Sequence, residues 1–268
     1  MANRPLPRSK ADAVWHERGH AGLWHEKLGG AWKDDWSLKA DRDGVSPKLE
    51  WMRPLLSKPV GNSKLLKEHA GRQKELAARL GGRLLEWENR SAFVTGLGQA
   101  HPIENGFLWH PCLGVPYLPG SGVKGVLRSW LKMEGPRLAA GLTGTADGPD
   151  DPPDATEIDR LLGTKARVGA IDLLPLIPAT HVNLQADLVN PHHGAYQRGG
   201  EWPADWQDPV PSFFLSVAAR SRWQTAVVPG AFGSKSDVDR AADWLVQAAD
   251  WIGFGAKTAV GYGRFREL

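Results

Sequence analysis

A glycine-rich turn that runs into an amphipathic helix constrains this sequence most. Residues 117–128 read YLPGSGVKGVLR, so a Pro-Gly turn is followed by Ser121 as the expected N-cap of a helix. From Val123 onward, apolar residues recur at i, i+3, i+4, i+7 and i+8, the spacing of a buried helix face. Lys124 and Arg128 lie on another face. Free N–H groups and two cations at one helix end suit an anion such as phosphate, and a closely packed, glycine-padded helix start would give the same pattern.

A second glycine-and-base segment lies almost at the C-terminus, at residues 253–264, GFGAKTAVGYGR. Part of it resembles the end of a Walker A loop, but Ala256 stands where that motif has glycine. Ten residues follow Thr258, which is too few for the helix that a Walker A loop requires. The repeated glycines would instead let the backbone lie along a phosphate chain, flanked by Lys257 and Arg264.

Two other motif matches lack the context that their functions need. Residues 120–125 match the G-x-G-x-x-G letters of a dinucleotide site, but a Pro-rich loop precedes them and an acidic insertion follows. Residues 16–20 match the H-E-x-x-H letters of a zinc protease, but Gly19 and Gly22 weaken the required helix. In addition, His25 misses the third-ligand spacing by one residue. We therefore expect neither a cofactor nor a metal ion.

The charge distribution and the cysteine content limit the partners and the cellular compartment that we expect. Residues 1–90 hold 18 Lys and Arg against 12 Asp and Glu, which suits a polyanionic partner and equally fits a soluble protein with one slightly basic half. The single cysteine, Cys112, excludes internal disulfides and fits a reducing compartment. No apolar run approaches 18 residues, and the N-terminus lacks the apolar core of a secretory signal. We therefore expect a cytoplasmic protein without a membrane partner.

The order of periodic segments predicts an α+β fold. Residues 1–82 read as a basic, mostly helical N-terminal extension that ends in an amphipathic helix at 62–80. Residues 83–268 read as a ferredoxin-like (RRM-like) domain of order β-α-β-β-α-β, with insertions near 134–166 and 190–211. The expected elements of this domain are a strand in 83–95, a helix at 121–133, a strand in 167–177, extended segments in 180–189 and 212–220, a helix at 236–252 and a last strand from 263.

Histidines in the connecting segments offer candidates for acid–base chemistry, such as RNA cleavage with a 2′-hydroxyl nucleophile. Nothing in their spacing pairs them with a base or a metal ion, and a histidine in a loop is usually not catalytic. These histidines are His101, His110, His181, His192 and His193.

The two glycine-and-base segments resemble a known family. Residues 119–128 look like the PGSSxKGxxR signature of the RAMP superfamily of CRISPR RNA-binding proteins, and 253–263 look like its glycine-rich loop. Gly122 departs from the second serine of that signature, which removes one hydroxyl near the expected phosphate. Residues 21–24, 190–192 and 203–211 narrow the resemblance to the family of the sixth Cmr subunit of type III-B CRISPR effector complexes.

This resemblance implies a non-catalytic structural subunit of a cytoplasmic ribonucleoprotein that serves antiviral defence. Such a subunit would bind the guide (crRNA) backbone, help to position the target RNA, and contact other Cmr subunits. The two segments would form adjacent parts of one surface, and residues 190–211 would be a finger that contacts the duplex or a neighbour. The expected RNA-binding residues are Gly120, Ser121, Gly122, Lys124, Arg128, Gly255, Lys257, Thr258, Gly261, Gly263 and Arg264.

The alternative function is a metal-independent endoribonuclease that processes CRISPR repeat RNA. Enzymes of this kind share the superfamily fold and use a loop histidine. His101 or His110 would take that role here. A histidine poised beside a bound phosphate would distinguish the two functions.

Overall fold

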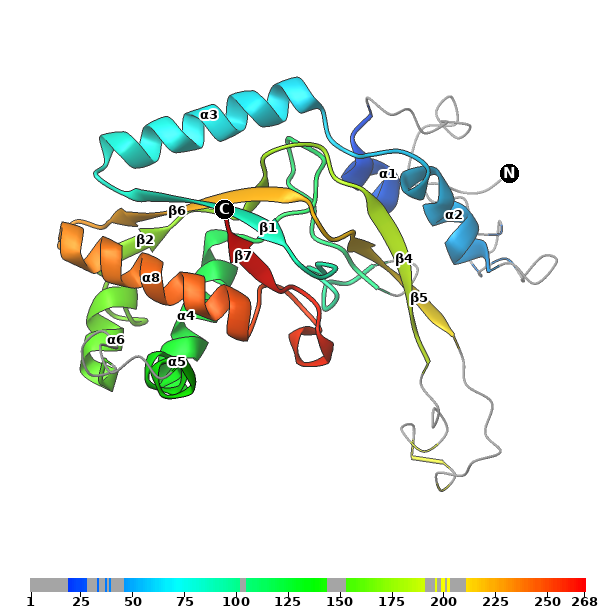
Figure 1. Cartoon of the computed structure of the whole chain (residues 1–268). Coiled ribbons are helices and arrows are strands. Elements are labelled where there is room, and N and C mark those ends of the chain that lie inside the picture. Colours follow the sequence, from blue (N-terminus) through cyan, green and yellow to red (C-terminus); the bar gives the residue numbers. More distant parts are fainter. Residues whose placement is uncertain are drawn as a thin grey trace.

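The computed structural model describes residues 19–27, 33, 37, 39, 46–101, 105–143, 153–190, 196, 199–200, 202 and 211–268. Its strands are β1 (Arg83–Asn89), β2 (Ile171–Leu173), β3 (Ile177–Pro178), β4 (Leu184–Val189), β5 (Ser212–Val217), β6 (Arg222–Pro229) and β7 (Phe265–Glu267). The main sheet is antiparallel and has the order β2-β6-β1-β7, with β3 also paired to β6 (Figure 1). β4 and β5 form a separate antiparallel ribbon that extends away from the body.

Helices cover both faces of the main sheet (Figure 1). α3 (Ser63–Arg79) lies on one face, while α4 (Gly120–Lys132) and α8 (Lys235–Trp251) lie on the other. Because both faces are covered, β6 is buried at every position from Trp223 to Val228. The remaining helices are α1 (Ala21–Lys27), α2 (Pro47–Leu56), α5 (Gly135–Thr143), α6 (Ala155–Leu162) and the 3-10 helix η2 (Thr258–Val260).

α3 is fixed to the sheet by small apolar side chains and by two paired amides. Ala77 of α3 packs against Ala226 of β6. The Gln224 Nε2 group donates to Gln73 Oε1 at 2.7 Å, and Gln73 Nε2 donates to the Pro175 carbonyl at 2.9 Å. These bonds satisfy amides that would otherwise be buried without partners. The sheet surface beneath α3 is therefore closed to the base stacking that open-sheet RNA-binding domains use.

An aromatic cluster on the other face ties the C-terminal segment to β1. Phe93 and Trp223 pack edge to face with ring centroids 4.9 Å apart, and Trp87 and Phe254 do so at 5.6 Å. Phe265 completes the cluster against Phe254 at 5.2 Å. All five side chains are buried, so they supply a large part of the core. Phe254 and Phe265 stand at either end of the second glycine-rich segment and fix where that segment lies.

The structure confirms the mixed α+β prediction and corrects its strands. The segment predicted at 212–220 ends at Val217 as β5, which belongs to the ribbon and not to the main sheet. The central strand of the main sheet is β6, which the sequence analysis did not predict. A short connection in which Arg220 has a φ of 66° separates β5 from β6. The predicted strand ends at this connection, before β6 begins at Arg222, so β6 has no assignment in the predicted order.

The helix predicted at 121–133 is α4, and the prediction that Ser121 is its N-cap is wrong. Pro119 occupies the N-cap position and makes no side-chain cap bond, while Ser121 lies exposed within the first turn.

The first expected insertion contains α5 and α6, and residues 144–152 of it lie outside the described residues. Most of 190–211 and the H-E-x-x-H letters at 16–18 also lie outside them. No helix in the described part of the chain is long and apolar enough to cross a bilayer. The division of the chain at residues 82 and 83 stays a prediction.

Candidate nucleic-acid interface

The glycines that start α4 allow close packing against neighbouring segments. A Cβ atom added at Gly120 would lie 2.1 Å from the Leu173 carbonyl oxygen, and one at Gly122 would lie 2.7 Å from Leu118 Cδ1. Neither position can hold a larger residue without a shift of its neighbours. Helix packing therefore accounts for both glycines, whether or not phosphate also approaches them.

A basic hollow of about 620 Å³ lies beside α4, and its charge comes from two segments. Lys124 of α4 faces Lys165 and Arg167, which belong to the loop after α6. None of these three side chains makes an ion pair with another described residue. Three cations around one open hollow form a site for a polyanion such as an RNA backbone.

Arg128 lines the same hollow but is engaged within the protein. Its Nη1 atom donates to Asp159 Oδ1 at 3.1 Å, and its Nη2 atom donates to the Gly163 carbonyl at 2.5 Å. Asp159 is the acidic side chain among the residues that line the hollow. Arg128 therefore fastens the end of α6 to α4 and neutralises Asp159, which leaves Lys124 as the available cation of the two predicted on this helix.

The loop at 163–169 is held in one shape by its own contacts. Gly163 has a φ of 77°, in the left-handed region that favours glycine. The Thr164 hydroxyl accepts the N–H groups of Ala166 and Arg167, each at 3.2 Å, and the Thr164 N–H donates to the Arg167 carbonyl at 2.8 Å. This turn presents Lys165 and Arg167 to the hollow.

Sequence reasoning missed Lys165 and Arg167. The available signal was the run Gly163 to Gly169, GTKARVG, which is a third short glycine-and-base segment.

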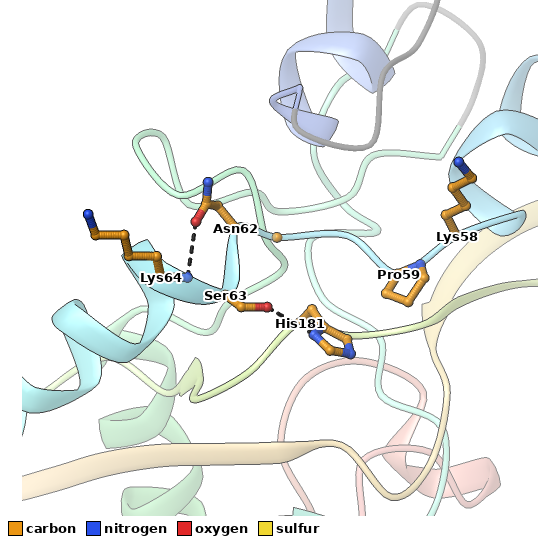
Figure 2. Close-up of a pocket in the computed structure, with 7 residues that line it drawn as sticks. Lys58, Pro59, Asn62, Ser63, Lys64 and His181 are labelled. Atoms are coloured by element: carbon orange, nitrogen blue, oxygen red, sulfur yellow. Dashed lines mark hydrogen bonds between the residues drawn. The ribbon is translucent and has the colours of Figure 1, made fainter.

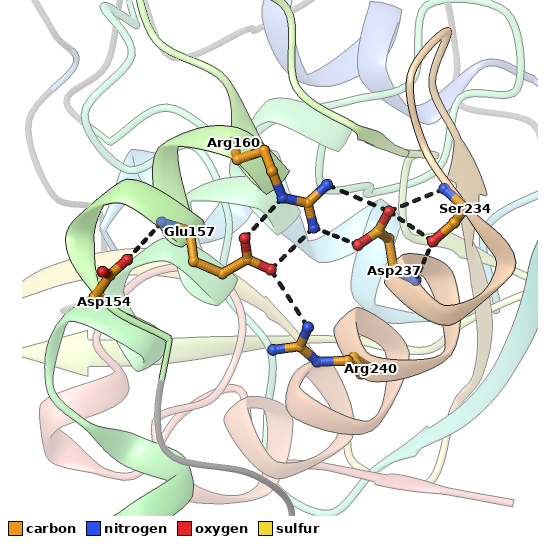
Figure 3. Close-up of polar contacts among 6 residues, drawn as sticks. All are labelled: Asp154, Glu157, Arg160, Ser234, Asp237 and Arg240. Carbon is orange, nitrogen blue, oxygen red and sulfur yellow. Dashed lines mark hydrogen bonds and ion pairs between the residues drawn. The ribbon is translucent and has the colours of Figure 1, made fainter.

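A network of ion pairs sets the position of α6 relative to α8 (Figure 3). The Arg160 guanidinium donates to both Glu157 oxygens, at 2.7 and 2.9 Å, and to the carboxylate of Asp237. Arg240 donates to Glu157 from the α8 side at 3.3 Å. The hydrogen bonds that Asp237 accepts from Arg160 lower the pKa of Asp237 to about 2. By holding α6 in place, the network keeps the loop that follows α6 beside Lys124.

The C-terminal glycine-rich segment is packed against residues 92–94. Ala256 donates its N–H to the Val94 carbonyl, and Gly263 donates its N–H to the Ala92 carbonyl, both at 2.7 Å. Gly255 and Gly263 have φ values of 87° and 71°. An added Cβ would lie 2.2 Å from the Val94 oxygen at Gly255 and 1.9 Å from the Phe254 oxygen at Gly263. These two glycines are therefore required by the backbone path of the segment itself.

The polar side chains of this segment also make internal contacts. Arg264 Nη2 donates to the Thr258 carbonyl at 3.4 Å, and the Arg264 N–H donates to Ser91 Oγ at 3.0 Å. Lys257 Nζ lies 4.9 Å from the ring centroid of Phe214, on β5, as a cation–π contact. Gly261 has a φ of 95°, and no heavy atom lies within 4 Å of an added Cβ, so only the turn conformation favours glycine there. Lys257 thus lies where the segment meets the β4–β5 ribbon.

The two predicted segments have different neighbours in the structure. The start of α4 adjoins β2, α6 and the loop at 163–169, whereas the C-terminal segment adjoins residues 91–94 and β5. That they form one continuous RNA surface stays a prediction.

The two histidines of the endoribonuclease alternative make structural contacts. His101 Nε2 lies 3.0 Å from the His25 carbonyl oxygen, and the His101 ring stacks on Trp51 with centroids 5.3 Å apart. His110 Nδ1 accepts the N–H groups of Cys112 and Leu113, at 3.3 and 3.2 Å. Each ring is thus held by packing or by a turn.

Comparison with known proteins decides the family. A model of the RAMP superfamily matches residues 88–266, which include α4, α6, the loop at 163–169 and the C-terminal glycine-rich segment. The chain belongs to the RAMP superfamily. Over 235 residues this RAMP chain is 29% identical to the CRISPR system Cmr subunit Cmr6 of Pyrococcus furiosus, covering 68% of this chain and 67% of that protein.

A solved structure shares the fold of this RAMP chain. The match is to a chain in the cryo-EM structure of the Type III-B Cmr-beta complex bound to cognate target RNA. The TM-score is 0.58 at 19% sequence identity, and the match covers 77% of this chain and 66% of that chain. At this identity the comparison concerns the fold alone.

Proposed function

We propose that this RAMP chain is a non-catalytic structural subunit of a type III-B CRISPR effector complex. In that complex it binds the guide RNA backbone, helps to position the target RNA and contacts other Cmr subunits. The similarity to Cmr6 and the fold shared with a chain of an RNA-bound Cmr complex support this function. The single observation that carries it is the hollow in which Lys124, Lys165 and Arg167 converge.

The proposed fold of the RAMP domain is ferredoxin-like. Along the chain, the strands of the main sheet and the two helices on the face opposite α3 follow the order β1-α4-β2-β6-α8-β7. The first and third of these strands, β1 and β6, are neighbours at the centre of the sheet, with β7 and β2 outside them. This order and the placement of α4 and α8 on one face support the ferredoxin-like assignment. The β4–β5 ribbon is then an insertion between β2 and β6.

Binding of RNA through its phosphates explains the chemistry of the hollow. Lysine and arginine side chains form charge-assisted bonds with phosphate oxygens, and such contacts carry no base sequence information. We therefore assign sequence-independent recognition of the RNA backbone to this hollow. A soluble complex in the cytoplasm, where guide and target RNA meet, is the proposed location.

The experiment compares RNA binding by three full-length forms of the chain. One form carries Lys124→Gln, Lys165→Gln and Arg167→Gln. A matched control carries Arg72→Gln, Lys74→Gln and Arg79→Gln, which removes the same number of charges from α3 on the opposite face of the sheet. Fluorescence anisotropy of a labelled single-stranded RNA, measured at several salt concentrations, gives the dissociation constant and its salt dependence.

The hollow variant should bind RNA more weakly than the control and with a flatter salt dependence. Each lost single-strand phosphate contact reduces the slope of log K against log salt by about 0.7. Three lost contacts therefore reduce it by about 2. An affinity and a slope equal to those of the control would overturn the proposed role of the hollow.

A further inference from the structure

A second basic surface lies where α3 begins (Figure 2). Lys58 and Lys64 stand on opposite sides of a hollow of about 340 Å³, with Asn62, Ser63 and His181 between them. A neighbouring hollow of about 710 Å³ shares Ser63 and His181 with the first. We call the two hollows together the α3 basic surface, and Lys67 and Arg222 line its second part.

The backbone beneath this surface is well fixed. Val60 and Val182 exchange two backbone hydrogen bonds, at 2.8 and 3.0 Å, which join the segment before α3 to the segment before β4. Asn62 Oδ1 accepts the N–H groups of Lys64 and Leu65, at 3.0 and 3.2 Å. The first N–H groups of α3 are thus already capped. The attraction for an anion comes from the side chains and not from a free helix end.

The charge of the α3 basic surface is predominantly positive. Lys64, Lys67 and Arg222 are exposed, and none of them makes an ion pair with another described residue. Glu86 is the acidic side chain among the residues that line the two hollows. The surface therefore has excess positive charge, contributed by the segment before α3, by α3 itself and by the start of β6.

The shape and lining of this surface favour a nucleic-acid strand over a small anion. The charge follows two shallow, adjoining hollows and does not converge on one enclosed point. Ser63 and Asn62 add the hydroxyl and amide groups that commonly contact phosphate and sugar. Ala179 and the exposed Leu268 add apolar atoms to the second hollow, where a ribose or a base can lie.

We infer that the α3 basic surface binds the phosphate backbone of a single RNA strand. This inference rests on the proposed function, because it takes RNA to be the polyanion that the chain meets. It adds a second contact, since α3 and α4 lie on opposite faces of the main sheet. A strand held at Lys124 and a strand held at Lys64 approach the chain from different sides.

The test adds one variant to the binding experiment above. Lys64→Gln, Lys67→Gln and Arg222→Gln remove three charges from the α3 basic surface and keep most of each side chain's length. The control remains Arg72→Gln, Lys74→Gln and Arg79→Gln, further along the same helix. Circular dichroism and thermal unfolding of each variant verify that it is folded. The probe is a labelled single-stranded RNA of about 40 nucleotides, long enough to reach both faces of a domain of this size.

The dissociation constant of the α3 variant should rise about tenfold at 0.1 M salt, with a salt slope lower by about 2. Lys64→Arg with Lys67→Arg should keep wild-type affinity, because arginine keeps the charge that phosphate requires. Equal RNA binding by the α3 variant and its control would refute the inference. Loss of binding to an acidic protein partner, with RNA binding unchanged, would also refute it.

The two proposals fail in different ways. If only the Lys124 hollow variant weakens RNA binding, the function stands and the α3 basic surface is not an RNA contact. If only the α3 variant weakens binding, the RNA site lies at α3 and the hollow is misassigned. If neither does, both proposals are wrong.

Discussion

The guanidinium group of Arg160, on α6, bonds directly to the carboxylate of Asp237, in the first turn of α8 (Figure 3). The two residues are distant in sequence, and their bond joins α6 to α8. Asp237 also accepts the Ser234 N–H at 2.9 Å, while Ser234 Oγ accepts the Asp237 N–H at 3.2 Å, a reciprocal capping box for α8. The bond between Arg160 and Asp237 therefore couples the start of α8 to the loop that carries Lys165.

Arg160→Ala should destabilise the chain by about 1–2 kcal/mol, because it leaves the nearly buried Asp237 carboxylate without its cation. The Asp237 side chain is only 9% exposed, whereas that of Arg160 is 41% exposed, which keeps the cost moderate. Urea unfolding measures the change. Arg79→Ala is the matched control, since Arg79 and its partner Glu75 are 77% and 61% exposed and their pair should contribute little. Similar losses in the two variants would contradict this account of the network.

His25 should make the chain less stable as the pH falls below about 6.5. Burial, and to a lesser extent the charge of His101, lower the pKa of His25 to about 3. The unfolded chain takes up a proton near pH 6.5, while the folded chain resists it until about pH 3. Stability is therefore full above pH 6.5 and falls by roughly 1 kcal/mol per pH unit below it.

Replacement of His25 by phenylalanine tests this pH dependence. His25→Phe should lower stability at pH 7.5, because Trp109 Nε1 loses its acceptor, His25 Nδ1, at 3.3 Å. It should also flatten the dependence of unfolding free energy on pH between 6 and 4. An unchanged slope in His25→Phe would show that other groups cause the acid sensitivity.

Local sequence patterns predicted the helices better than they predicted the sheet. α4 and α8 follow from periodic apolar residues close together in the chain, which a single segment reveals. The central strand β6 follows from pairing with β1 and β2, at partners such as Arg83 with Val227 and Ile171 with Pro229. Those partners are far apart in sequence, so residues 222–229 by themselves do not identify β6 as the central strand.

The candidate site was predictable only in part for the same reason. Lys124 follows from the glycine-rich helix start, but the place of Lys165 beside it depends on long-range contacts of α6, such as Arg160 with Asp237 and Arg128 with Asp159. Glycine is needed at position 120 because of the Leu173 carbonyl, and residues 117–128 alone do not show that this carbonyl lies there. Glycine and base content indicated the chemistry, whereas long-range packing determined which cations remain available.

The full chain should not cut repeat-containing RNA at specific sites in the absence of metal ions, if His101 and His110 have the structural roles seen here. His101→Ala should instead lower the unfolding temperature, because it removes a stacking partner of Trp51 and His25. Gel analysis of labelled repeat RNA, with and without chelator, measures cleavage. Specific cuts that disappear in His101→Ala would restore the endoribonuclease alternative.

The glycine-rich C-terminal segment should respond to alanine substitutions according to position. Gly263→Ala should cost about 3 kcal/mol or more, because its φ is 71° and the new Cβ would lie 1.9 Å from the Phe254 oxygen. Gly261→Ala should cost only about 1 kcal/mol, since its φ is 95° but its surroundings are open. Gly125→Ala, in the interior of α4 with open space around it, should stabilise the chain by about 0.5–1 kcal/mol.

These three variants also separate the structural role of the glycines from phosphate contact. Urea unfolding gives the stability order, and RNA anisotropy below the unfolding transition gives the binding of the folded chain. If the segment's glycines serve its backbone path, Gly261→Ala keeps wild-type RNA affinity despite its lower stability. If RNA lies against this backbone, the added methyl group at the exposed Gly261 weakens RNA binding while Gly125→Ala does not. Equal stability losses in Gly263→Ala and Gly261→Ala would contradict the packing described for this segment.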